Sequence, residues 1–253
     1  MLVMVQGDCM PVQEAVLGDD LSARQPLRPL AAYSGTLAQK VYATLREAIL
    51  SLSYPPGDIL RKPEICAYLG VSRSPVSEAV ARLAAEHLVD VVPQAGTFVA
   101  RLSMAEIREG AFLREALELA AVERVAGAAT EAQVAQLRAN LGQQEAFLQG
   151  ADCAGFYQAD ARMHEMILSF TGFRRVAGLA DTTWAHVNRA RQLILPQPGR
   201  VEDTFAEHRQ IVAAVEARDV EGARGAVRMH LGKLIGFLEP LAQNRPDLFE
   251  PED

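Results

Sequence analysis

The sequence predicts a mainly α-helical protein of two domains, a winged helix-turn-helix followed by an antiparallel bundle of helices. Apolar residues recur at helical spacing through nearly all of residues 36–243. Two β-branched runs around a turn interrupt this pattern once, as the wing of a small helical domain would. Charge also changes along the chain, because residues 36–102 hold 7 of the 25 basic and 6 of the 32 acidic side chains, leaving 18 and 26 elsewhere. We therefore predict domains of residues 36–102 and 103–243.

The first domain begins with two predicted helices. Apolar residues recur at every fourth position after Thr36, and this helix ends before Pro55. A second, short helix runs from Pro63 to Leu69 and is followed by Gly70, which suits the left-handed position after a helix. The spacing predicts two packed helices ahead of a tight turn.

A third helix and a β-hairpin complete this domain. Ser72 or Ser74 can cap the helix, and Pro75 suits its first turn. Residues 89–92 and 97–99 are β-branched runs on either side of a Pro-Gln-Ala-Gly turn, which predicts two short strands. The order of elements is that of a winged helix-turn-helix.

In that arrangement the third helix can enter the major groove of DNA, and the N–H groups at its start favour phosphate. A packing module of three helices with solvated serines is the alternative interpretation. The candidate DNA contacts are Arg61, Lys62, Ser72, Arg73, Ser74, Ser77 and Gly96.

Six further helices are predicted in the second domain, separated by short Gly, Pro or Asp breaks. Six helices with short connections favour an antiparallel bundle. Their expected ranges are 104–128, 131–149, 152–170, 174–195, 201–217 and 219–240. Residues 1–35 lack periodicity and are expected to form a flexible extension, and residues 244–253 a C-terminal tail.

Four residues of this domain can close around one divalent metal. Asp160 and His164 stand at i and i+4 on one helical face, and His208 and His230 follow in later helices beside apolar residues. Three imidazoles and a carboxylate suit one transition metal per chain, Zn²⁺ before Ni²⁺, Mn²⁺ or Fe²⁺. The alternative is that these histidines are surface or satisfied core residues.

The first domain resembles the DNA-binding domain of the GntR family of regulators. The matching segments are Pro55–Asp58, Leu69–Val76 and Gly96–Val99. Pro63 and Ser77 stand where the family usually has arginines, so the resemblance implies DNA binding more firmly than it implies the usual operator sequence.

The second domain resembles the FadR-type ligand domain of the same family. Its matching segments are Arg114–Glu118, Asp160–His164, Glu207–Ile211 and Met229–Leu231. In the metal-binding branch of these domains an aspartate and three histidines are the ligands, which implies that role for Asp160, His164, His208 and His230. The resemblance further implies a small organic acid as effector.

An anionic effector could bind the metal and pair with an arginine. Arg114 lies on the inward stripe of its helix, where Glu118 could pair with it without any ligand. Asn188 and Arg191 are further candidates for the lining of the effector site, although Arg191 could equally be a solvated surface residue.

We expect a homodimeric, cytoplasmic repressor that binds a palindromic operator in double-stranded DNA and senses a small carboxylate at its metal site. We expect a dimer that binds the two half-sites of a palindrome, because one recognition helix contacts too few base pairs for useful specificity. A purely structural metal is the alternative. A metal-dependent enzyme is less favoured because no general base or catalytic motif accompanies the ligands, and no apolar run is long enough to cross a membrane.

Overall fold

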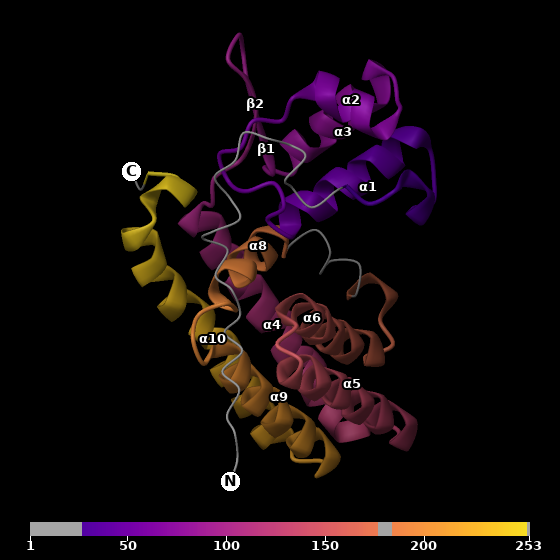
Figure 1. Cartoon of the computed structure of the whole chain (residues 1–253). Helices are drawn as coiled ribbons and strands as arrows, with labels where there is room; N and C mark the ends of the chain where they lie inside the picture. The colour runs from indigo at the N-terminus through magenta and orange to yellow at the C-terminus, as the bar shows by residue number, and fades with distance from the viewer. Residues whose placement is uncertain (1–26, 177–183, 252–253) are drawn as a thin grey trace. The chain divides into compact units, whose positions relative to one another are not determined.

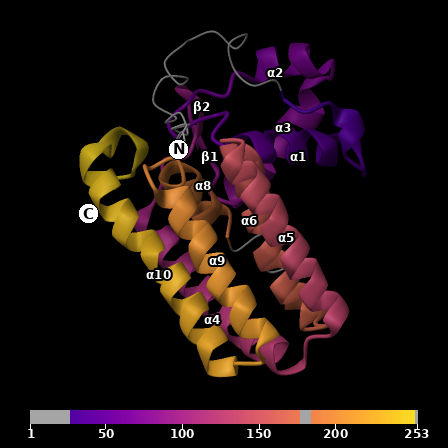
Figure 2. The ribbon, with the colours of Figure 1, turned by 60° about the horizontal axis from the view of Figure 1, so that its bottom comes forward.

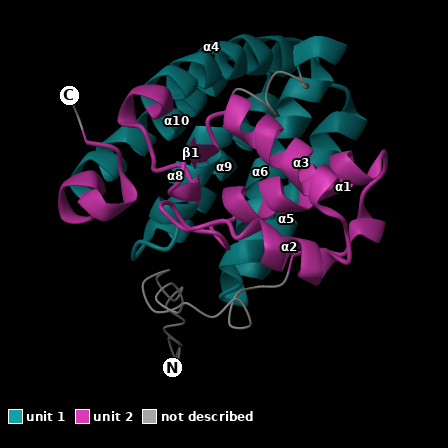
Figure 3. Cartoon of the chain, turned by 90° about the horizontal axis from the view of Figure 1, so that it is seen from above, with its two compact units in different colours: residues 1–13, 108–240 teal, residues 14–107, 241–253 magenta. Residues whose placement is uncertain are grey.

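The computed structural model describes residues 27–176 and 184–251. The chain divides into two compact units (Figure 3). Within the described residues, unit 2 comprises residues 27–107 and 241–251, and unit 1 comprises residues 108–240. Two long helices, α4 (Met104–Ala128) and α10 (Val220–Asn244), contribute residues to both units.

Unit 2 has the predicted winged helix-turn-helix order (Figure 1). Its elements are the 3-10 turn η2 (Leu30–Ala32), α1 (Leu37–Leu50), α2 (Lys62–Leu69), α3 (Arg73–Ala85), β1 (Val89–Val92) and β2 (Gly96–Val99). Helices α1 and α3 pack against each other through an apolar interior. The predicted stripes are buried as expected, with Leu45 and Leu83 both fully inaccessible to solvent.

Local sequence explains where these helices begin and end. Thr36 forms a capping box with Gln39 at the start of α1, and Gly70 ends α2 at φ 65°. Helix α3 begins at Arg73, with Ser72 as the residue before it, but the Ser72 side chain makes no capping hydrogen bond. The capping role expected for a serine here is therefore absent, although the helix starts where that pattern placed it.

The wing is an antiparallel pair in which Val89 lies opposite Val99 and Val92 opposite Gly96. Its turn requires a left-handed residue, and Gln94 adopts φ 62° there. Gly96 has φ 144°, and a Cβ at this position would lie 3.4 Å from the Phe98 ring. This close approach explains why a glycine begins β2.

Residues 27–35 pack against α1. Leu27 is buried, the carbonyl oxygen of Arg28 accepts a hydrogen bond from the Thr44 hydroxyl, and the Tyr33 hydroxyl donates to Glu47. These residues are therefore part of the folded unit, which shortens the extension expected from the sequence; residues 1–26 lie outside the described residues.

The segment after α10 also joins unit 2. The Leu102 N–H donates to the Leu248 carbonyl and the Glu250 N–H donates to the Leu102 carbonyl, each at 2.9 Å. Phe249 is buried beside this pairing, and Pro246–Leu248 forms the 3-10 turn η3. The expected tail thus contributes to the interior of the winged unit.

Unit 1 is a set of helices that lie lengthwise beside one another (Figure 2). Short turns make α5 and α6, and likewise α9 and α10, antiparallel neighbours, and α5 packs on both α6 and α9. The elements besides α4 and α10 are α5 (Glu131–Gln149), α6 (Cys153–Phe170), α8 (Ala185–Ile194) and α9 (Arg200–Glu216).

Helix boundaries in this unit agree closely with the predicted ranges, with two differences. The predicted helix 174–195 is described as helical at its C-terminal end only from Ala185, where α8 begins with Trp184 as its N-cap, and residues 177–183 lie outside the described residues. Helix α10 continues through Pro240 to Asn244, four residues beyond the predicted end. Among the described helices, none combines the length and apolar character that a membrane span requires.

Candidate metal centre

The four residues singled out as candidate metal ligands in the sequence meet inside unit 1. Helix α6 supplies Asp160 and His164 from one face, α9 supplies His208 and α10 supplies His230. One ligand atom from each lies within 4.8 Å of the other three, and all four side chains are buried. The fold therefore brings together residues that are 70 positions apart in the sequence.

The atoms that face one another are the Nε2 atoms of the histidines and one carboxylate oxygen. His230 Nε2 lies 3.3 Å from the Nε2 atoms of both His164 and His208. The Oδ1 atom of Asp160 lies 3.2 Å from His164 Nε2 and 3.6 Å from His208 Nε2.

The opposite nitrogen of two of these rings contacts a carboxylate. His164 Nδ1 lies 2.6 Å from Glu118 Oε2, and His230 Nδ1 lies 2.6 Å from Glu207 Oε2. An ionised carboxylate only accepts hydrogen bonds, so each Nδ1 must carry the proton. The Nε2 atom of each neutral ring then presents its lone pair to the centre.

The third ring is oriented by a chain of amides. The Asn140 side-chain amide donates to the carbonyl of Ala159, and Gln144 Nε2 donates to the Asn140 carbonyl oxygen. The Gln144 Oε1 atom is thereby left as an acceptor, 2.7 Å from His208 Nδ1. His208 must donate from Nδ1, which aims its Nε2 lone pair at the same centre.

This arrangement could hold a cation. Asp160 Oδ1 is buried without a hydrogen-bond partner, and no proton remains between the three imidazoles. Burial lowers the pKa of His230 to about 4 and that of His208 well below its ordinary value, so both rings are neutral ligands near pH 7. Three nitrogen donors and one oxygen donor could hold Zn²⁺ or a related transition metal.

The outer carboxylates are themselves held by cations. Glu118 Oε1 accepts a hydrogen bond from Arg114 Nε at 2.7 Å. Glu207 accepts a bidentate pair from Arg200 at 2.8 and 3.1 Å, and a further bond from Lys233 at 2.6 Å. Burial opposes ionisation of both acids, but the neighbouring histidine and arginine of each keep its pKa below the ordinary value.

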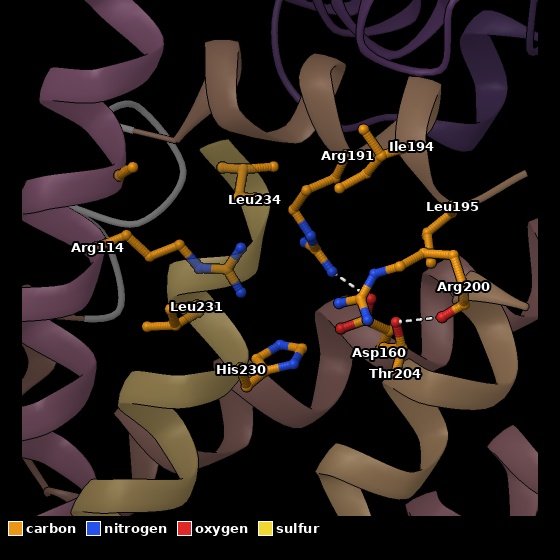
Figure 4. A pocket seen from close by; sticks show the side chains of 11 residues that line it. Arg114, Asp160, Arg191, Ile194, Leu195, Arg200, Thr204, His230, Leu231 and Leu234 are labelled. Atoms are coloured by element: carbon orange, nitrogen blue, oxygen red, sulfur yellow. Dashed lines mark hydrogen bonds and ion pairs between the residues drawn. The ribbon is translucent and has the colours of Figure 1, made fainter. Parts of the chain in front are cut away.

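A pocket opens beside the centre, and Figure 4 shows its side chains. Asp160 and His230 belong to its wall, so a metal held by the four residues would border the pocket. The lining residues are Ala111, Arg114, Asp160, Arg191, Ile194, Leu195, Arg200, Thr204, His230, Leu231 and Leu234.

Two of the three predicted effector residues line this pocket. Arg114 pairs with Glu118, as the spacing suggested. Arg191 is buried and pairs with Asp160, which rules out the solvated surface position considered for it. Asn188 is not part of the lining, and its side-chain oxygen instead accepts a hydrogen bond from Arg191 at 3.4 Å.

Sequence reasoning missed Arg200 and Gln144. Arg200 stands eight residues before His208, hence on the same face of α9, and that spacing was the available signal. Gln144 gave no signal, because a single glutamine on an amphipathic helix has no spacing that relates it to a histidine 64 residues later.

The predicted DNA contacts lie in unit 2. Ser72, Arg73, Ser74 and Ser77 are all exposed around the start of α3, away from its buried stripe. The remaining predicted contacts are Arg61 and Lys62 at the start of α2 and Gly96 at the start of β2. Arg61 forms an exposed ion pair with Glu64 at 3.7 Å.

Known proteins resemble this chain over most of its length. It is 35% identical over 214 residues to an uncharacterized HTH-type transcriptional regulator of Streptomyces ambofaciens, covering 85% of this chain and 90% of that protein. It is 30% identical to the HTH-type transcriptional repressor RspR of Escherichia coli K12, covering 85% and 94%. Residues 37–99 match the bacterial regulatory proteins of the gntR family, and residues 109–233 match the FCD domain. The chain belongs to the GntR family.

The solved structure of E. coli McbR/YncC shares the fold of this GntR protein, with a TM-score of 0.71, 21% sequence identity and coverage of 82% of this chain and 99% of that one. The family and these relatives are transcriptional regulators rather than enzymes. The chain is therefore a transcriptional regulator with an N-terminal GntR domain and a C-terminal FCD domain, as the motifs predicted.

Proposed function

We propose that this regulator is a homodimeric, cytoplasmic repressor that binds a palindromic operator and responds to a small carboxylate at a metal centre. The observation that carries the sensing part is the convergence of three imidazole lone pairs and an unpartnered Asp160 oxygen beside a pocket lined by arginines. The relative RspR is named as a transcriptional repressor, which supports repression rather than activation as the mode of regulation.

The centre would be held by Asp160, His164, His208 and His230, with Zn²⁺ as the first choice of metal. Four protein ligands leave one or two coordination positions for water or a carboxylate if the geometry expands beyond tetrahedral. A bound metal would supply an electrophilic centre at the wall of the pocket. Arg114 and Arg191 would orient the carboxylate there through charge-assisted hydrogen bonds.

The DNA-reading surface would be the start of α3, with support from α2 and the wing. Arg73, Ser72, Ser74 and Ser77 lie at an exposed helix N-terminus, where N–H groups and side-chain donors favour phosphate and base edges. Two copies would place two such helices in successive major grooves of a palindrome. Carboxylate binding would alter operator affinity through a change in unit 1.

The test is fluorescence anisotropy with DNA from the upstream region of the protein's own gene, at fixed salt, with and without chelator and a panel of small carboxylates. We expect tight binding that one carboxylate weakens, and no such response after chelation. The variant Arg73→Ala should weaken binding by about ten-fold or more. Arg82→Ala, at the other end of α3 and half exposed, is the matched control and should change little.

Three outcomes would count against the proposal in different ways. Tight DNA binding that ignores both chelator and carboxylates would favour the alternative of a purely structural metal. Loss of affinity in Arg82→Ala equal to that in Arg73→Ala would displace the reading surface from the start of α3. No specific binding to any upstream DNA would overturn the assignment of an operator near the gene.

A further inference from the structure

Three arginines line the pocket, and each is matched by one acid. Arg114 pairs with Glu118, Arg191 with Asp160, and Arg200 with Glu207. The positive charge of the pocket wall is thus already balanced before any metal or ligand is considered.

A divalent metal changes this balance. Its three histidine ligands are neutral when Nδ1 carries the proton, so the two positive charges of the metal have no counterpart among these groups. Lys233, whose side chain is 38% exposed, adds a further positive charge at the edge through its bond to Glu207. Unpaired charge in a buried site is costly. A ligand with two negative charges would balance the two charges of the metal, whereas water or a monocarboxylate would not; the charge of the partly exposed Lys233 is then left to solvent.

Two arginine N–H groups lack an acceptor. Arg114 Nη2 and Arg200 Nε are both buried without a hydrogen-bond partner, whereas Arg114 Nε donates to Glu118 and both Nη atoms of Arg200 donate to Glu207. The two side chains come from different helices, α4 and α9. Figure 4 shows Arg114 on one side of the pocket, with Arg191 and Arg200 on the other. The unmet donors are thus on two separate guanidinium groups of one pocket.

The other residues that line the pocket favour a ligand whose central part is apolar. Ile194, Leu195, Leu231 and Leu234 offer only hydrocarbon to a ligand. The hydroxyl of Thr204 already donates to the Arg200 carbonyl at 2.7 Å. A ligand with anionic ends and an unsubstituted carbon chain matches both the donors and the apolar surface.

We propose that the pocket is specific for a small dicarboxylate, with one carboxylate at the metal accepting from Arg114 and the second accepting from Arg200 Nε. This inference rests on the proposed function and gives its ligand class. Arg200 is then the residue that distinguishes a dicarboxylate from a monocarboxylate of equal length, because an end that lacks charge leaves its N–H unmet.

The test titrates succinate, butyrate and inorganic phosphate into the zinc-loaded full-length protein. Trp184 is the single tryptophan of the chain and lies 5.2 Å from the Arg114 guanidinium, so its emission reports occupancy near Arg114. Calorimetry provides an independent affinity. We expect succinate to bind at least about ten-fold more tightly than butyrate, since one charge-assisted hydrogen bond contributes about 1.5–3 kcal/mol.

Variants then test the role of Arg200. Arg200→Gln should weaken succinate binding by about ten-fold or more and leave butyrate affinity within about three-fold. Arg209→Gln, at an exposed position of the same helix, is the matched control and should change neither. Bound zinc is measured in each variant, because Arg200 also holds Glu207. If Arg200→Gln loses zinc or fails to fold, Arg200→Lys keeps a positive charge near Glu207 but lacks Nε, and should still lose the preference for succinate.

Three contrary results of these binding experiments would each refute a different part of the proposal. Equal weakening of succinate and butyrate in a zinc-retaining variant would show that Arg200 only positions Glu207 and His230. Tighter binding of butyrate or of phosphate than of succinate would refute the dicarboxylate assignment while leaving anion sensing intact. Failure of every carboxylate to bind, with zinc present, would refute the proposed function itself together with this inference.

Discussion

The two units are built around interiors of opposite character. The winged unit packs α1 against α3 through aliphatic side chains such as Val41, Leu45 and Leu83, all fully inaccessible to solvent. In unit 1, by contrast, five helices direct ionisable groups inward. Among the described residues, every buried arginine, glutamate, aspartate and histidine belongs to unit 1.

On the proposed function, this difference separates residues that stabilise the fold from residues that would bind a metal or a ligand. Burial of an aliphatic side chain stabilises by roughly 1.5–3 kcal/mol and needs no specific partner. A buried ion pair contributes little net stability, yet removal of one partner is strongly destabilising. On the proposed function, the buried charges of unit 1 would hold a metal and its ligand, and the aliphatic interior of unit 2 would support the DNA-reading surface.

Metal removal should produce the largest difference in thermal stability between the two units. Binding at about a thousand times the dissociation constant stabilises by roughly 4 kcal/mol, which corresponds to a shift of about 10 °C for a domain of this size. We expect chelation to lower the melting temperature of unit 1, followed by Trp184 emission, by about that amount. The transition of unit 2, followed by calorimetry, should stay in place. Equal shifts in the melting temperatures of both units would contradict this expectation. His87→Ala changes an exposed histidine outside the centre and is the control, so chelation should lower the melting temperature of unit 1 in this variant as in the unchanged protein.

Acidification of the metal-free protein should have the next largest effect. The pKa of His230 is lowered by burial from 6.5 to about 4, so between these values the unfolded chain binds the additional proton. The contribution of the neutral His230 to the free energy of unfolding is therefore complete above pH 6.5 and is lost as the pH falls toward 4. The loss is on the order of 3 kcal/mol. His208 acts in the same direction. Thermal melts from pH 7.5 to 4 should show a steeper loss for unit 1, and parallel losses in the two units would count against this account.

The outer carboxylates should set metal affinity. Glu118→Gln removes the charge that fixes the proton on His164 Nδ1 and leaves Arg114 without its acid. We expect metal affinity to fall by about 10–100-fold, measured by competition with a chromophoric chelator. Glu165→Gln lies on the exposed side of the same helix as His164 and is the control. Unchanged affinity in Glu118→Gln would show that the ring is oriented by packing alone.

Helix caps should give the smallest effect and should not distinguish the units. Thr36 with Gln39 caps α1 in unit 2, and Thr130 with Gln133 caps α5 in unit 1, through the same reciprocal hydrogen bonds. Thr36→Ala and Thr130→Ala should each cost about 1 kcal/mol, measured by chemical denaturation. Markedly unequal costs would mean that the units differ in their local helix stability and not only in their interiors.

Much of the candidate site could be predicted because one helical turn brings positions i and i+4 to one face. Asp160 and His164 follow from that rule, and Arg114 with Glu118 follows from it too. The joining of His208 and His230 to them depended on resemblance, since helical spacing cannot relate residues on separate helices. The burial of Arg191 against Asp160 was beyond such rules for the same reason, whereas Arg200 shares a helix with Glu207 and His208 and could have been found from that spacing.

The sequence by itself determined the fold class, most helix boundaries and the family, because periodicity, caps and motif residues act over a few positions. Tertiary structure alone decided which nitrogen of each histidine faces the centre, through partners as distant in sequence as Gln144 is from His208. It alone also decided that the C-terminal segment pairs with Leu102. The histidine tautomers and the arginine N–H groups that lack an acceptor depend on distances between atoms of different helices. Those distances are set by packing, and the sequence pattern does not contain them.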